Sequence, residues 1–228
     1  NHCIGAKSAL SILPFLLIDE GDYLLTTTPG YAVMPNVTKW LGGKVYEMEI
    51  TPKNNFLPDL DKIPLRVLKR AKMMYLNYPN NPTGAVADLN FYEKVVKFAK
   101  KHNIFVVSDA AYLPLVFNKK DQVSFLKVKG AIDIGAEVHT LSKGHNMTGW
   151  RIGFVVSNPY IINLFAKVKD VVDSGQFIPI QKAAITALNN DQIIEQNNQK
   201  LLRRHILISD VLNKIGLKSR IPKGTFYQ

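Results

Sequence analysis

The chain has 228 residues, with 29 lysines and arginines against 18 aspartates and glutamates and a net charge of +11. Its length suits one large domain, or one domain with part of a second, around a sizeable core. No apolar run approaches the roughly 20 residues of a membrane span, and the lysines form no basic block typical of nucleic-acid binding. The single Cys3 excludes an internal disulfide and agrees with a cytoplasmic location. We expect a globular protein without a metal site.

The first half of the chain alternates between strand-like and helix-like segments. Residues from Gly5 to Leu17 have helical spacing, with a kink expected at Pro14. Strands are predicted over residues 23–27, 44–50, 72–76 and 104–108, and helices before 42–43 and over 89–101. The continuously apolar segment 104–108 is typical of a parallel strand that is covered on both faces. The pattern therefore indicates an α/β protein with parallel strands.

The second half carries one more predicted strand pair and then a series of helices. Residues 138–141 read as a strand, and another apolar run follows Gly153. Helices are expected from Asn158, over 179–188 and over 191–215, and the last, at about 37 Å, is long enough to bridge two domains. Residues 217–221 and 225–227 are predicted as strands of a second unit. We therefore expect a large domain over 1–192, and a linker helix with the start of a small α+β domain over 193–228.

A lysine at the end of a buried strand is the first candidate for chemistry. Lys143 must lose water or find a partner there, and such an amine can form a Schiff base with a carbonyl, best known in α/β proteins from pyridoxal phosphate. An isolated Ser142-Lys143 pair is more often a solvated loop. Arg151, eight residues further on, offers a planar fork for an oxyanion. The interpretation depends on the other strand ends.

Polar or aromatic residues also follow the other predicted elements. Asp109 ends a buried strand and needs a cationic or N–H partner, which a helix N-terminus or a protonated pyridine nitrogen would supply equally well. The loop Asn81-Pro82-Thr83-Gly84 follows the strand at 72–76. Tyr31 follows another strand, where it could stack on a flat ring or simply pack. The helix start Gly5-Ala6-Lys7-Ser8 suits a phosphate, or serves only as a turn.

Taken together, these motifs resemble fold-type I pyridoxal-phosphate aminotransferases of the aspartate aminotransferase superfamily, over essentially the whole chain. The resemblance rests on four segments: Asn81–Gly84, Ser108–Tyr112, Ser142–Met147 and Gly149–Gly153. It implies a three-layer α/β/α large domain with a mostly parallel central sheet. It also implies pyridoxal 5'-phosphate as cofactor, and transfer of an amino group between an amino acid and a 2-oxo acid such as 2-oxoglutarate.

The resemblance assigns a role to each candidate residue. Lys143 corresponds to the lysine that binds the cofactor covalently and later moves the substrate proton, and Asp109 to the partner of the pyridine nitrogen. Asn81 and Tyr112 correspond to ligands of the ring oxygen, and Tyr31 to the stacking aromatic residue. The phosphate ligands implied are Ala6, Lys7, Ser142 and Arg151, with Lys7 in a position where many relatives carry a small polar residue.

The resemblance extends to partners and substrate. It implies a homodimer, an arginine for the substrate carboxylate beyond Gln228, and an arm before Asn1, so we expect a piece of a longer protein. The segment Val171–Phe177, with the loops around Asn146 and Gly5, is similar to LL-diaminopimelate aminotransferases. Aspartate, alanine or methionine aminotransferases, a C–S lyase and an aminotransferase-like domain of a transcriptional regulator stay open as alternatives.

Overall fold

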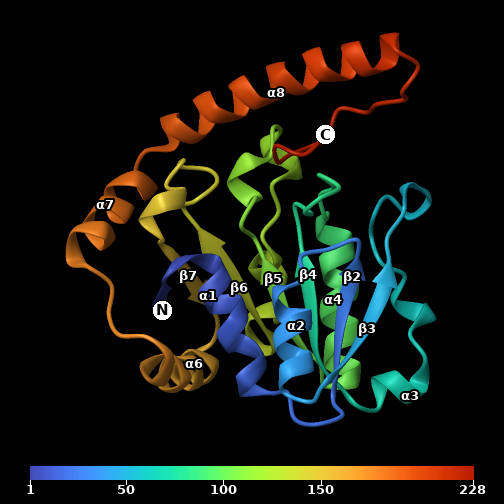
Figure 1. Ribbon diagram of the computed structural model, residues 1–228. Coiled ribbons are helices and arrows are strands. Elements are labelled where there is room, and N and C mark those ends of the chain that lie inside the picture. The colour runs from blue at the N-terminus through green and yellow to red at the C-terminus, as the bar shows by residue number, and fades with distance from the viewer.

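The computed structural model describes all 228 residues as a central sheet with helices on both faces and one long helix above it (Figure 1). The strands are β1 (His2–Cys3), β2 (Tyr23–Thr28), β3 (Lys44–Glu49), β4 (Ala71–Asn77), β5 (Phe105–Asp109), β6 (Gly135–Thr140) and β7 (Gly153–Val156). The helices are α1 (Gly5–Ile12), α2 (Val33–Trp40), α3 (Leu65–Leu68), α4 (Leu89–His102), α5 (Ala131–Ile134), α6 (Pro159–Val172), α7 (Ile178–Leu188) and α8 (Asp191–Lys214).

The sheet confirms the predicted mostly parallel topology. Its order is β1-β7-β6-β5-β4-β2-β3, with β2 to β6 parallel and with antiparallel pairing of β7 to both β6 and β1. The register places Asn77 of β4 opposite Asp109 of β5, and Asp109 opposite Val138 of β6. The carboxyl ends of three neighbouring strands therefore meet at one edge, where ligands of open α/β sheets bind.

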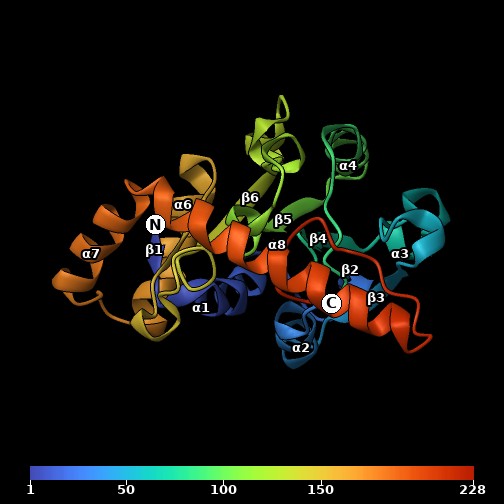
Figure 2. The same cartoon turned by 90° about the horizontal axis from the view of Figure 1, so that it is seen from above.

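Two apolar clusters bury the two faces of the sheet. On one face, Leu10 of α1, Met34 of α2 and Phe165 of α6 pack with the strands. On the other face, α4 contributes Tyr92 and Val95 to a separate cluster. Figure 2 shows α1 and α2 on one side of the sheet and α4 on the other. The strands between them are covered on both faces, which explains their continuous apolar runs.

Local sequence signals fix several helix ends. Asp88 caps α4 by accepting a hydrogen bond from the backbone N–H of Phe91 at 2.7 Å, and Asn103 ends the helix in the left-handed conformation. Asn158 caps α6 in the same way. The first helix differs from the prediction, because α1 ends at Ile12 and residues Leu13–Leu16 form a 3₁₀ turn. Pro14 lacks the N–H that would continue the α-helical ladder.

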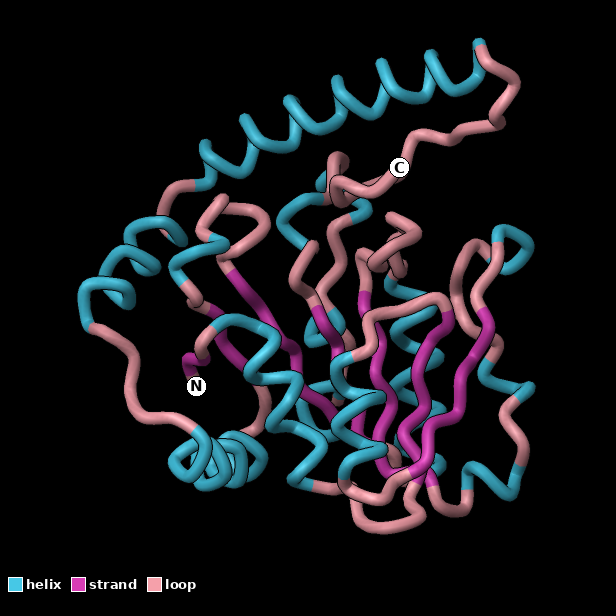
Figure 3. Tube along the Cα trace, viewed as in Figure 1, coloured by secondary structure: helices cyan, strands magenta, loops and turns pink.

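The C-terminal strands predicted at 217–221 and 225–227 are wrong. Only an isolated bridge between Val116 and Gly224 forms there, and Figure 3 draws everything after α8 as loop. A strand needs a neighbouring backbone along its length, and this segment has one only at that bridge. Helix α8, roughly 36 Å long, crosses above the carboxyl edge of the sheet (Figure 2). No helix is long and apolar enough to cross a membrane.

Candidate active site

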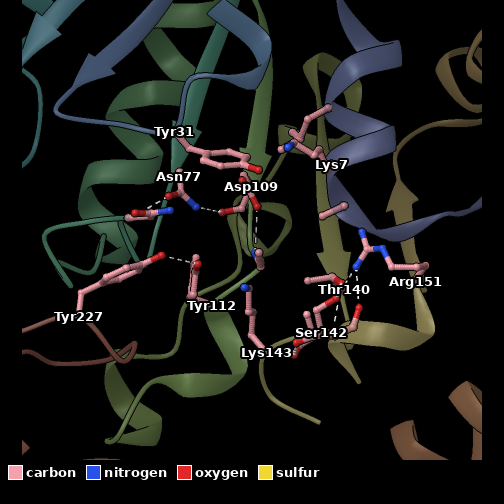
Figure 4. Close-up of a pocket in the computed structure, with 15 residues that line it drawn as sticks. Lys7, Tyr31, Asn77, Asp109, Tyr112, Thr140, Ser142, Lys143, Arg151 and Tyr227 are labelled. Carbon is pink, nitrogen blue, oxygen red and sulfur yellow. Dashed lines mark hydrogen bonds between the residues drawn. The ribbon is translucent and has the colours of Figure 1, made fainter. Parts of the chain in front are cut away.

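A cavity of about 250 Å³ lies at the carboxyl edge of β4, β5 and β6. The structure brings all nine predicted site residues to its wall: Ala6, Lys7, Tyr31, Asn81, Asp109, Tyr112, Ser142, Lys143 and Arg151. Figure 4 shows Tyr31 beside Asp109 and Asn77 in one part of the cavity, and Arg151 near Ser142 and Thr140 in another. Residues from five separate segments of the chain thus converge on one space.

Asp109, the last residue of β5, is a buried carboxylate held by neutral donors. Its side chain is 3% exposed and accepts hydrogen bonds from the Tyr75 hydroxyl at 2.8 Å and from the Ala111 N–H at 3.1 Å. Burial raises the pKa of Asp109, while these hydrogen bonds and the positive charge of Lys143 act in the opposite direction. No cation contacts the carboxylate directly. The oriented Asp109 carboxylate could therefore accept a hydrogen bond from a cationic donor inside the cavity.

Tyr75 supports Asp109 from within β4. Its side chain is 1% exposed, and burial together with the neighbouring carboxylate raises its pKa well above the usual range, so the hydroxyl stays a neutral donor. Asn77, at the end of the same strand, donates to the Asp109 carbonyl at 3.0 Å and accepts from the Asn81 N–H at 2.8 Å. Two strand residues therefore fix both the carboxylate and the loop that carries Asn81.

Lys143 lies three residues beyond the end of β6, in the turn that begins at Ser142. It is half-buried, and its Nζ lies 5.6 Å from the centre of the Tyr112 ring and 5.4 Å from that of Phe226. The ammonium forms no ion pair with a carboxylate. Aromatic faces stabilise a cation only modestly, so the amine faces the cavity without a strong competing partner.

Arg151 and the start of α1 form a second polar cluster. The Arg151 guanidinium donates to the Thr148 carbonyl at 2.9 Å, and to Ser142 Oγ and the Ile4 carbonyl at 3.4 Å each. It has no acidic partner, and no side chain caps the N-terminus of α1. An uncapped helix N-terminus next to a free guanidinium and a hydroxyl suits an anion such as a phosphate.

Gly5 permits this close approach. A Cβ at Gly5 would lie 2.2 Å from the Nη2 atom of Arg151, and its φ of +76° also favours glycine. Thr140 supports the other side by donating to the Ile152 carbonyl, 2.9 Å away, and its Oγ lies 3.0 Å from Ser142 Oγ. The guanidinium is therefore seated by backbone geometry rather than by an acid.

Lys7 lines the cavity, whereas the segment Val171–Phe177 does not. Lys7 is exposed but lines the cavity, with no carboxylate partner. In the segment Val171–Phe177, Gln176 donates to the Arg151 carbonyl and does not line the cavity. With Lys143 and Arg151, Lys7 gives three cations against the single carboxylate of Asp109. The cavity is thus suited to a ligand with a net negative charge.

Several residues that line the cavity or support its wall were not predicted from the sequence. Asn77 and Thr140 end β4 and β6, so their strand-end position was an available signal. Tyr75 lies inside a strand, and which face it occupies is visible only once the sheet forms. Tyr227 reaches the cavity from 115 residues beyond Tyr112, whose hydroxyl lies 2.8 Å from its own. No local sequence pattern predicts such a contact.

The aminotransferase class I and II family model matches residues 3–228. With the sheet topology and strand-end cavity described above, this match places the chain among proteins of the fold-type I class. The chain belongs to the aminotransferase class I and II family.

Particular relatives refine this assignment. The chain is 52% identical to the LL-diaminopimelate aminotransferase of Methanocaldococcus jannaschii and 48% identical to that of Methanococcus maripaludis, in each case over 99% of this chain and 54% of the relative. It spans about half the length of these curated relatives. Among solved structures, apo-BacF of Bacillus subtilis matches with a TM-score of 0.96 and 39% identity, over 99% of this chain and 58% of that one.

Proposed function

We propose that the complete protein is a pyridoxal-phosphate-dependent aminotransferase, and that the cofactor occupies the cavity at the ends of β4, β5 and β6. The observation that carries the proposal is the meeting of Asp109, Lys143 and Arg151 around one space. Single residues of these types are common at strand ends, but the cofactor requires a cation-accepting carboxylate, an amine and an anion site together.

The residues present fit the chemistry of this cofactor. The uncapped start of α1, Ser142 Oγ and the Arg151 guanidinium would hold the phosphate, with Ala6 and Lys7 at the same helix start. Asp109 would hold the protonated pyridine nitrogen, because its carboxylate is buried without a cation. Tyr31 would cover one face of the ring. The three unpaired cations match the negative charge of the phosphate.

Lys143 would bind the cofactor covalently and then act as the base. Its Nζ faces the cavity without an acidic partner, so it can bond to an aldehyde carbon and, once released, carry a proton from the α-carbon of the substrate. Asn81 and Tyr112 would donate hydrogen bonds to the ring oxygen. When bound, pyridoxal phosphate supplies the electron sink that makes the α-proton removable.

We further propose LL-diaminopimelate and 2-oxoglutarate as the substrate pair. The support is the 48–52% identity to two archaeal proteins of that name. Residues 1–192 would then form the large domain, and α8 with the residues after it would lead into the small domain. The protein would act in the cytoplasm.

We also propose a homodimer. Apolar side chains are exposed at the end of α6 and the start of α7: Val171 is 88% exposed, Phe177 71% and Ile178 63%. Exposed apolar patches of this kind mark association surfaces. Light scattering on the complete protein should give twice the monomer mass, and a stable monomer at micromolar concentration would contradict the proposal.

Absorbance and product analysis test the function. The complete protein mixed with pyridoxal phosphate should develop a visible absorbance band that Lys143→Ala loses, while the exposed-lysine control Lys97→Ala keeps it. Incubation with LL-diaminopimelate and 2-oxoglutarate should yield glutamate. A folded protein without the band would refute cofactor binding. A band with pyruvate or ammonia release from cystathionine, and no glutamate from LL-diaminopimelate and 2-oxoglutarate, would favour a C–S lyase.

A further inference from the structure

The last residues of the chain are built into the wall of the cavity. After α8 the chain turns back beneath that helix (Figure 1), where the Thr225 N–H donates to the Leu115 carbonyl and the Phe117 N–H to the Lys223 carbonyl, both at 3.0 Å. These bonds flank the bridge between Val116 and Gly224. The segment Lys223–Gln228 is therefore fixed against the loop that follows β5 and carries Tyr112.

Helix α8 holds the same segment from above. His205, 3% exposed, donates from Nε2 to the Thr225 carbonyl at 3.1 Å, and its Nδ1 lies 2.6 Å from Gln228 Oε1. Gly224 fits closely, since a Cβ there would lie 2.9 Å from the Leu115 carbonyl oxygen. The segment is anchored on both sides of its two aromatic residues, Phe226 and Tyr227.

This anchoring brings the Tyr227 hydroxyl to the Tyr112 hydroxyl. The two oxygens are 2.8 Å apart, the ring centres are 5.6 Å apart, and the rings meet edge to face at 63°. Phe226 packs against the Tyr112 ring at 5.4 Å. Both tyrosines line the cavity (Figure 4). Tyr112 therefore cannot change its rotamer without breaking this bond and the aromatic contacts.

Hydrogen-bond counting sets the direction of the proton in this pair. A phenol has one O–H to donate and lone pairs to accept. If Tyr112 uses its only proton toward a ligand, the bond to Tyr227 can exist only with Tyr227 as the donor. Accepting that bond polarises the Tyr112 O–H and strengthens its own donation, by about 10–30% in condensed-phase estimates.

We propose that Tyr227 is a positioning residue for the cofactor reaction, donating to Tyr112 so that the Tyr112 proton is directed at the ring oxygen of pyridoxal phosphate. This inference rests on the function proposed above. It assigns a role in the site at the strand ends to a residue that lies beyond α8. Tyr227 would donate to Tyr112, and Tyr112 would donate in turn to the ring oxygen.

Other charged or titratable groups also face the Tyr112 phenol. Asp109 and Tyr31 line the same cavity, and the Lys143 ammonium lies over the Tyr112 ring. Burial and the Asp109 charge raise the pKa of Tyr112 far above neutrality. The phenol therefore stays protonated at the pH of any assay, and any effect of Tyr227 acts through hydrogen bonding rather than through loss of the Tyr112 proton.

The test is a pH titration of the visible band of the cofactor-loaded, complete protein. A donated hydrogen bond stabilises a ring oxygen that has lost its proton and so lowers the pH midpoint of the band. Tyr227→Phe keeps the ring packing and should raise the midpoint by roughly 0.3–1 pH unit, where one unit corresponds to about 1.4 kcal/mol. Tyr112→Phe should raise it at least as much, and the exposed control Tyr160→Phe should leave it unchanged.

The double variant decides between positioning and a separate effect. If Tyr227 acts through Tyr112, adding Tyr227→Phe to Tyr112→Phe should shift the midpoint no further. An unchanged midpoint in Tyr227→Phe would overturn the proposal, and so would a full additional shift in the double variant. A wild-type protein without any band would refute the proposed function itself, a distinct result from a band that titrates identically in all variants.

Discussion

The strand ends and the layer above them are held in place by different interactions. Asp109, Ser142 and Lys143 sit at or just beyond the ends of ladder-bonded strands, over a core buried on both faces. Helix α8 buries only His205 and Ser209, and its side chains donate hydrogen bonds to the loops that follow β5 and β6. The strand ends are thus fixed by the core, whereas the upper layer, which is α8 and the residues after it, has fewer buried side chains.

The upper layer still reaches both critical loops. Asn197 donates to the Gly144 carbonyl at 2.8 Å, next to Lys143, and accepts from Asn146 at 3.0 Å. Asn198 donates to the carbonyls of Pro114 and Val116 in the loop after Tyr112. Changes at the strand ends should therefore abolish chemistry, and changes in α8 should only weaken it.

The largest effect is expected at Asp109. Asp109→Asn removes the charge that would hold the pyridine nitrogen protonated, and kcat/KM for amino transfer should fall by about a hundredfold or more, the range seen when a charge-stabilising group is lost. Steady-state kinetics on the complete protein measure this, with the exposed Asp133→Asn as control. A loss below tenfold would show that Asp109 is structural.

The next effect concerns the anion site. Gly5→Ala would force its Cβ against the Arg151 guanidinium and should weaken pyridoxal phosphate binding about tenfold or more, because a hydrogen bond to a charged group contributes about 1.5–3 kcal/mol. The matched control is Gly149→Ala, whose Cβ would have no atom within 4 Å. Equal cofactor dissociation constants for the two variants would contradict the seating of Arg151 by Gly5.

A smaller effect is expected from the upper layer. Asn198→Ala removes donation to the carbonyls of Pro114 and Val116, at 3.0 and 3.2 Å, and should lower the free energy of unfolding by about 1 kcal/mol. Gln196→Ala, at an exposed position of the same helix, shares the gain in helix propensity without losing a bond. Urea denaturation compares them. A larger loss of unfolding free energy for Gln196→Ala than for Asn198→Ala would contradict the role of the Asn198 hydrogen bonds in holding α8 to the loop after β5.

The smallest effect is expected in the pH dependence of stability, because the hydrogen bonds from Tyr75 and Ala111 offset part of the rise in the pKa of Asp109 that burial causes. Burial raises the pKa of Asp109 in the folded protein, so the folded state binds this proton more tightly than the unfolded chain. The cofactor-free protein therefore loses stability as pH rises from about 4, the ordinary aspartate value, through the folded pKa.

The variant Asp109→Asn has no carboxyl group at this position and so does not bind or release this proton. Its free energy of unfolding, relative to the wild type, should increase as pH rises and level off above the folded pKa of Asp109. Urea denaturation of the cofactor-free proteins between pH 4.5 and 7.5 measures the difference. A relative stability that instead falls with rising pH would contradict the raised pKa.

The same contrast explains what the sequence could predict. Asp109 and Lys143 follow apolar strands, and parallel strands bring their carboxyl ends to one edge, so their meeting was predictable. The final segment was misread as strand, because its partner at Val116 lies more than a hundred residues away. Tyr75 and Tyr227 were missed for a related reason, since contacts through a strand face or a returning chain leave no local periodicity.

The most direct test of the central claim locates the covalent partner of the cofactor. The complete protein is incubated with pyridoxal phosphate, reduced with sodium borohydride and digested, and mass spectrometry identifies the lysine that carries the pyridoxyl group. The strand-end site predicts modification of Lys143 at about one group per chain, with the Lys143→Ala variant unmodified. Modification of another lysine, or equal labelling spread over the exposed lysines, would contradict it.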